Sequence, residues 1–266
     1  MLDDHRFSWK RLIDPLADVP AGPAYHQALI NFMVHDHQQA RQNNLSNPDK
    51  AVCDGLWRDL RQVMAYVIDD AGLTPDSHAL FLKKYMPVHN RLGNGACLDA
   101  MEKMLALIRA GVLDISFGKN PVFTGDEESG EYLITSADGC LTARVNTLIE
   151  ARIHEFDPGT DRNPLYRNML QRGLITQWMN QNKSHGQTFT PGGIQLTDDF
   201  HPVNAQHQTE HGISVLGPPS EGKFFFQIGA ARPNQNHHVL NDMIKWANQF
   251  LKKMDYAEVS SKEEIA

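Results

Sequence analysis

The 266-residue sequence is poor in cysteine, has no long apolar run and carries no excess of positive charge. Its three cysteines, Cys53, Cys97 and Cys140, are far apart and odd in number, which excludes a disulfide framework and a C-x-x-C metal site. No apolar run approaches the roughly 18 residues of a membrane helix, and the acidic start lacks a signal-peptide core. We therefore expect a cytoplasmic protein with no membrane partner.

Two further features that the sequence lacks limit the classes of ligand that the chain is expected to bind. The net charge of −7 argues against nucleic acid as a partner, because phosphate-backbone binding needs clustered Lys and Arg. The pattern G-x-G-x-x-G does not follow any strand-like run. That glycine turn lets a pyrophosphate approach a helix N-terminus, so the sequence predicts no dinucleotide cofactor held by this chain alone.

The pattern of apolar residues changes at Gly111. Helical periodicity comes before it, whereas short apolar runs separated by turns follow it and predict strands at 112–117, 122–123, 131–135, 141–149, 213–216 and 224–228. The polar stretch 180–193 predicts a mobile loop, and 234–254 predicts a closing helix. The sequence thus predicts an α+β fold with a helical part, 1–110, packed on a β-rich part, 111–266, as two domains or one continuous domain.

Several segments between Cys53 and Phe250 carry a resemblance to a known family: residues 56–61, 72–78, 85–92, 105–113, 149–153, 216–222 and 231–233. They resemble the C-terminal region of the bacterial FAD/NAD(P)-binding oxidoreductase family, here without its N-terminal nucleotide-binding fingerprint. The resemblance implies that the β-rich part is the remnant of a dinucleotide-binding, Rossmann-like scaffold. Arg152 stands where that family has a small Thr-Gly pair, so no bound FAD is expected.

The segment 85–92 supplies the first candidate site residues. Pro87 predicts an extended path, in which His89 and Arg91 share one face and Asn90 takes the other. His89 is predicted to transfer protons and Arg91 to bind a substrate carboxylate, with Asn90 also in contact with the substrate. The alternative is a structural Arg91 that holds the helix starting near Cys97.

Two further arginines, Arg58 and Arg61, lie three residues apart on a predicted helix and so share a face. They form either an anion clamp that binds the substrate or a surface salt-bridge set with Asp59.

The last candidates surround a turn made rigid by Pro218, Pro219 and Gly222. Glu221 in this turn is predicted to transfer protons, and Phe226 to line an apolar pocket wall. Arg232, before the closing helix, is predicted to be a second carboxylate anchor. The alternative places the phenylalanines in an ordinary core.

One metal pattern is present, because residues 207–211 match H-x-x-E-H. That motif needs a helix, and Pro202 before it and Gly212 after it argue against one. The sequence therefore predicts no metal.

These features suggest a small-molecule enzyme of bacterial specialised metabolism that works without its own redox cofactor. Acid–base chemistry on an amino-acid-like or keto-acid-like substrate with a carboxylate, such as a Pictet–Spengler-type condensation, is the predicted reaction. The alternative is a non-catalytic partner subunit or an oxidoreductase fragment that completes a flavoprotein pocket. A homo-oligomer, such as a homodimer, is left open.

Overall fold

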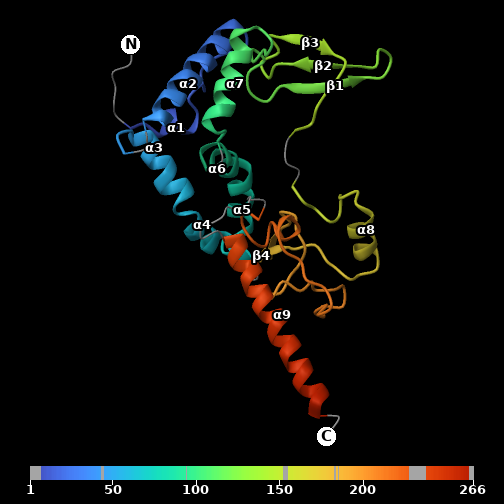
Figure 1. Ribbon diagram of the computed structural model, residues 1–266. Coiled ribbons are helices and arrows are strands. Elements are labelled where there is room, and N and C mark those ends of the chain that lie inside the picture. The colour runs from blue at the N-terminus through green and yellow to red at the C-terminus, as the bar shows by residue number, and fades with distance from the viewer. Residues whose placement is uncertain are drawn as a thin grey trace. The chain divides into compact units, whose positions relative to one another are not determined.

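The computed structural model describes residues 7–42, 45–93, 95–151, 155–182, 184, 186–227 and 238–263. Helices dominate and two small antiparallel sheets accompany them, which confirms the α+β class (Figure 1). The chain forms two compact units, Met1–Asp59 with Pro87–Arg152 (unit 1) and Leu60–Met86 with Ile153–Ala266 (unit 2). Each unit therefore combines segments from distant parts of the sequence. The boundary expected at residue 110 stays a prediction.

Unit 1 pairs helices with a three-stranded sheet. Its helices are α1 (Trp9–Ile13), α2 (Pro23–Arg41), α3 (Pro48–Val52), the π-helix η1 (Cys53–Arg58) and α7 (Leu98–Arg109). The strands β1 (Val122–Asp126), β2 (Glu131–Thr135) and β3 (Thr142–Val145) pair antiparallel in that order. The core of the unit lies between α2 and α7, where Met33 packs against Leu105 and Ile108.

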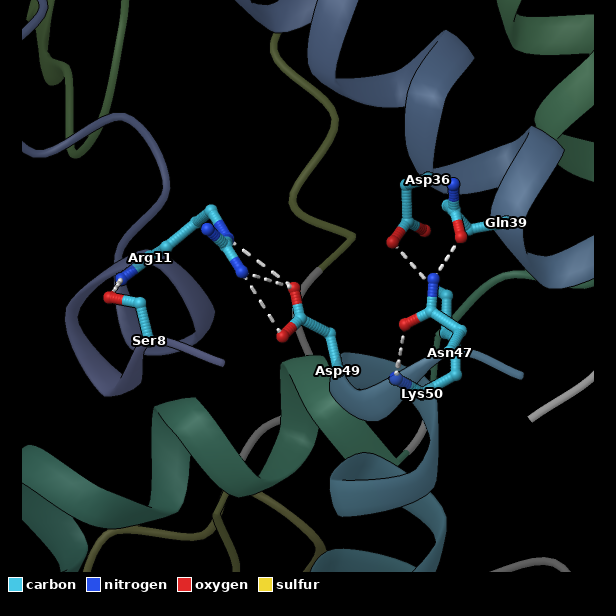
Figure 2. A network of polar contacts seen from close by, with 7 residues as sticks. All are labelled: Ser8, Arg11, Asp36, Gln39, Asn47, Asp49 and Lys50. Carbon is cyan, nitrogen blue, oxygen red and sulfur yellow. Dashed lines mark hydrogen bonds and ion pairs between the residues drawn. The ribbon is translucent and has the colours of Figure 1, made fainter. Parts of the chain in front are cut away.

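Polar contacts hold the first three helices of unit 1 together (Figure 2). The guanidinium group of Arg11 on α1 donates to the carboxylate of Asp49 on α3, with nitrogen–oxygen distances of 3.3–3.4 Å. Asn47 caps α3 by accepting from the backbone N–H of Lys50, whose ammonium group pairs with Asp36 on α2. Side-chain caps of this kind satisfy backbone donors that a helix N-terminus leaves unpaired.

Unit 2 contains shorter elements and two hydrophobic clusters. Its elements are α4 (Arg61–Ile68), η2 (Asp69–Ala71), α5 (Pro75–Leu80), the π-helix η3 (Phe81–Tyr85), α8 (Pro164–Gln171), β4 (Asn180–Asn182), β5 (Gln187–Phe189), η4 (Pro218–Ser220) and α9 (His238–Glu263). One cluster comprises Ala65, Ile68, Met86, Phe225 and Phe226. The other comprises Ile175, Ile194 and Leu196.

The extended path predicted for residues 85–92 is wrong, because α6 (Met86–Gly93) is helical. Pro87 lies in the first turn of α6, directly after the π-helix η3. A wider π turn can accommodate a proline ring and its missing N–H, which would disturb a regular α-helix. On a helix, two residues that are two positions apart lie about 200° apart, so His89 and Arg91 do not share a face.

Three of the predicted strands are also wrong. Residues 112–117, 213–216 and 224–227 form no strand, and Phe226 has a φ of +63° that belongs to a turn. The predicted loop 180–193 instead contains the β4–β5 hairpin. Every pair of described strands is antiparallel, whereas a Rossmann-like scaffold is built on parallel strands.

Candidate functional site

A group of ionisable side chains lies close to Phe226 in unit 2, where the turn after α4 meets the loop after η4. We call it the Phe226 cluster, and it comprises Arg61, Asp69, Glu221, Phe226, His238 and Asp242. The backbone N–H of Phe225 donates to Asp69 Oδ1 at 2.6 Å, and the backbone N–H of Asp70 donates to Lys223 O at 2.9 Å. These two bonds join segments that are more than 150 residues apart in the sequence.

Glu221 fixes the loop around Phe226. Its carboxylate accepts from the backbone N–H of Phe226, at 2.9 Å to Oε1, and from the backbone N–H of Gln227 through Oε2. The left-handed backbone at Phe226 is unfavourable for a bulky side chain, and these bonds help to hold it. The guanidinium carbon of Arg61 lies 4.5 Å from the centre of the Phe226 ring, within cation–π range.

The first turn of α9 closes the cluster. His238 Nε2 lies 3.0 Å from the carbonyl oxygen of Phe226, so this nitrogen carries the proton and donates. The side-chain amide of Gln227 donates to Asp242 Oδ2 at 3.4 Å. The loop that ends at Gln227 is thereby tied to the start of the last helix.

Burial changes the acidity of the carboxyl groups in this cluster. Burial raises the pKa of Asp69 to about 7, against the opposing bond from Phe225, and the nearby carboxylates of Asp242 and Asp70 add to the rise. Burial also raises the pKa of Asp242. A carboxyl group with a pKa near 7 can accept or release a proton at neutral pH, which is the property required of a general base.

A buried lysine lies beside the acids. The side chain of Lys223 is 5% exposed, and its ammonium group lies 3.1 Å from Asp70 Oδ1 and 3.3 Å from Asp198 Oδ1. Two carboxylates thus compensate one buried positive charge, as burial of an ion requires.

Two glycines allow neighbouring backbone segments to approach each other closely around Glu221. Gly193 has a φ of +79°, and a Cβ atom there would lie 2.0 Å from the carbonyl oxygen of Glu221. A Cβ atom on Gly222 would lie 2.5 Å from the carbonyl oxygen of Gly192. The backbone around Glu221 is therefore held by contacts that only glycine permits.

The residues predicted from segment 85–92 lie in unit 1. His89 is fully buried, with its ring centre 6.1 Å from that of Trp57. Arg91 donates to the carbonyl oxygens of Leu12 and Ile13 at the end of α1, at 3.0 Å for Ile13, and burial lowers its pKa. Asn90 is exposed.

The two remaining arginines lie on different elements. Arg58 ends η1 and pairs with Asp54 at 2.9 Å and with Asp59 at 3.0 Å, whereas Arg61 begins α4 in the Phe226 cluster. Arg232 lies outside the described residues. Of the predicted residues, the structure therefore brings together Arg61, Glu221 and Phe226, and the substrate and catalytic roles of all eight stay predictions.

The sequence patterns missed three members of the cluster, namely Asp69, His238 and Asp242. Asp69 belongs to an acidic pair just before Gly72, which looks like an ordinary exposed helix end. Its hydrogen bond with the backbone N–H of Phe225 joins it to a segment 156 residues away, so no local signal distinguishes it.

No group of three or more His, Cys, Asp or Glu side chains among the described residues could hold a metal ion, and residues 207–211 are not helical. None of the helices in the described part combines the length and the apolar character that a membrane crossing requires.

Three curated proteins are similar to this chain, although no family model matches it. Nitrosuccinic acid synthase npaA of Aspergillus oryzae is 29% identical over 245 residues, or 90% of this chain. The nitrosuccinate-forming L-aspartate N-monooxygenases of Streptomyces cremeus and Streptomyces davaonensis are 30% and 29% identical, each over 89% of this chain. The chain spans 36% of the length of each relative.

These relatives overturn two predictions from the sequence. The resemblance to the C-terminal region of the FAD/NAD(P)-binding oxidoreductase family is wrong, because the matched proteins are named as L-aspartate N-monooxygenases and a nitrosuccinic acid synthase. The cofactor-free acid–base enzyme is wrong as well, because the matched enzymes include oxygenases. Short motifs such as residues 56–61 were too brief to separate one oxidoreductase family from another. The alternative, a part of an oxidoreductase, fits the relatives better.

Proposed function

We propose that this chain forms part of an enzyme that oxygenates the amino nitrogen of L-aspartate or a closely related amino acid. The supporting observation is 29–30% identity over about nine tenths of the chain to proteins named for this reaction and its product. Because the chain spans 36% of those relatives, we assign the complete reaction to the chain together with the remaining part of such an enzyme.

The chemistry divides into two tasks. Each round of monooxygenation transfers one oxygen atom of O2 to the nitrogen and reduces the other to water with two electrons from a donor. The conversion of an amino group into a nitro group is a six-electron oxidation of the nitrogen, so it requires several such rounds. In the described residues every strand pair is antiparallel, so they hold no parallel βαβ unit for a dinucleotide. We assign the electron donor to the remaining part of the enzyme and a share of amino-acid binding to this chain.

The Phe226 cluster suits the second task. An amino group can react with an electrophilic oxygen atom only after its ammonium form loses a proton, and Asp69, with a pKa of about 7, suits that proton. Arg61 provides a guanidinium group that can hold a carboxylate of the amino acid by two parallel bonds. Glu221, bound to two backbone N–H groups, keeps Phe226 in place beneath Arg61.

A region-exchange experiment tests this function. The matched region of the Streptomyces cremeus enzyme is replaced by this chain, and nitrosuccinate formation from L-aspartate is measured. We expect the exchanged enzyme to retain activity on L-aspartate and to lose it in the Asp69→Asn variant. An exchanged enzyme that folds normally, as judged by circular dichroism and melting temperature, but forms no nitrosuccinate would contradict the proposal.

A further inference from the structure

The last helix of unit 2 is docked through its polar side. Lys245 donates to the carbonyl oxygen of Asp198 at 2.6 Å, and Gln249 donates to Asp199 Oδ1 at 2.6 Å. Lys253 Nζ lies 3.2 Å from His201 Nε2. These helix residues are four apart, so they form one stripe along α9, and the contacts fix the rotation of the helix about its axis.

The apolar side of α9 consequently faces away from the loop 198–201. We call it the α9 stripe, and it comprises Met243, Ile244, Ala247, Phe250, Leu251 and Met254. Apart from Ala247, its side chains are 45–59% exposed. At 100° per residue they cover an arc of roughly 120°, centred opposite the docked polar stripe. An amphipathic helix normally buries its apolar face, so this orientation is inverted.

Charge is confined to the docked side. Between His238 and Met254, the charged residues Asp242, Lys245, Lys252 and Lys253 all lie within an arc of roughly 100° centred on the docked contacts. The α9 stripe therefore carries no charge that would oppose contact with an identical helix, since like charges would otherwise face one another.

We propose that the α9 stripe is a dimerisation surface, on which α9 of a second copy of this chain packs antiparallel. A two-fold axis at Ala247 places Met243 opposite Leu251 and Ile244 opposite Phe250 of the other copy. The small Ala247 side chains let the two helices approach closely at the axis. The five large side chains are about half exposed, so their complete burial removes at most roughly 500 Å² per copy, and the pair then reaches the lower size limit of about 1,000 Å² for a specific interface.

Sedimentation velocity of the full chain tests this surface over a concentration series. The monomer mass is 30.0 kDa, and an interface of the minimal size predicts a reversible dimer at concentrations of about 10–100 µM. We expect the double variant Ile244→Glu/Leu251→Glu to stay monomeric with an unchanged circular dichroism spectrum. Lys252→Glu places the same new charge outside the stripe and should leave the dimer intact.

Cross-linking tests the geometry independently of those variants. With Cys53, Cys97 and Cys140 replaced by serine, Ala247→Cys should form a disulfide-linked dimer under mild oxidation, whereas Lys252→Cys should not. A monomer throughout the concentration series would overturn the proposal, and so would a dimer that survives the double variant. Cross-linking at position 252 but not at position 247 would overturn the antiparallel packing.

Discussion

Asp69 lies in an environment unlike that of an ordinary exposed aspartate. Its pKa of about 7 in the folded chain compares with 3.8 for a normal carboxyl group. Between these pH values the folded chain binds more protons than the unfolded chain. The contribution of this group to the free energy of unfolding therefore falls as the pH rises from about 4 to about 7. The native structure thus retains a destabilising group at neutral pH, which is common at functional sites.

Replacement of this group gives the first prediction. Asp69→Asn keeps an oxygen acceptor for the Phe225 N–H but removes the buried charge. We expect its free energy of unfolding to exceed that of the wild type by about 2 kcal/mol at pH 8, after allowance for partial exposure, and to match it near pH 4. Urea unfolding across this pH range measures the difference.

Asp126 provides a control, because its contribution to stability changes with pH in the opposite direction to that of Asp69. Its bond to Arg144 lowers its pKa to about 2, so its contribution to stability is present above pH 4 and is lost on acidification. Asp126→Asn should therefore be less stable than the wild type at pH 8. Equal pH profiles for Asp69→Asn and the wild type would show that Asp69 is not buried as described.

The two arginines at the η1–α4 boundary give the second prediction. In the region-exchanged enzyme, Arg61→Ala should raise the KM for L-aspartate by roughly 10–100-fold, the loss of a charged hydrogen bond, whereas Arg58→Ala should change it less than about threefold. Arg58 is the matched control because Asp54 and Asp59 already neutralise it at the surface. Steady-state kinetics with both variants decides the assignment, and equal effects would remove Arg61 from the proposed site.

At the scale of elements, tight backbone contacts place the Glu221 loop. Gly193 and Gly217 both have positive φ, but a Cβ atom at Gly193 would meet the carbonyl oxygen of Glu221, whereas one at Gly217 would meet nothing within 4 Å. Alanine at these two positions therefore separates two losses of stability: the loss from a left-handed backbone, which both positions share, and the loss from a steric clash, which only Gly193 has.

This comparison gives the third prediction. Gly217→Ala should lower the free energy of unfolding by about 1 kcal/mol, from the left-handed backbone alone. Gly193→Ala should cost more, about 3 kcal/mol, because a backbone carbonyl cannot move aside as a flexible side chain can. Chemical denaturation of both variants measures the costs. Equal losses would mean that the Gly193–Glu221 contact does not form.

Some elements form from interactions between residues that are neighbours in the sequence, and the sequence predicted these elements. Residues 122–123 lie in β1 and residues 131–135 form β2, as their apolar runs predicted. The apolar run at Phe224–Phe226 failed as a strand, because the backbone N–H groups of Phe225 and Phe226 donate to the distant Asp69 and to Glu221, which holds the run in a turn. The candidate site was predictable as far as Arg61, Glu221 and Phe226, whereas Asp69, His238 and Asp242 lie in it only through contacts that no local pattern encodes.

At the scale of the whole molecule, each compact unit is assembled from separate segments, as when residues 60–86 join residues after 152. Apolar periodicity describes one segment at a time, so it cannot predict such an assembly. The relatives add the other whole-molecule fact, that this chain matches 36% of a longer enzyme.

The most direct measurement is isotope incorporation by the region-exchanged enzyme. Supplied with L-aspartate under ¹⁸O₂, it should release nitrosuccinate that carries ¹⁸O on nitrogen, detected by mass spectrometry, with the intact Streptomyces cremeus enzyme as the control under the same conditions. Labelled product would place this chain in amino-acid N-oxygenation. Unlabelled nitrosuccinate, or none from a folded exchanged enzyme while the intact enzyme is active, would contradict the account.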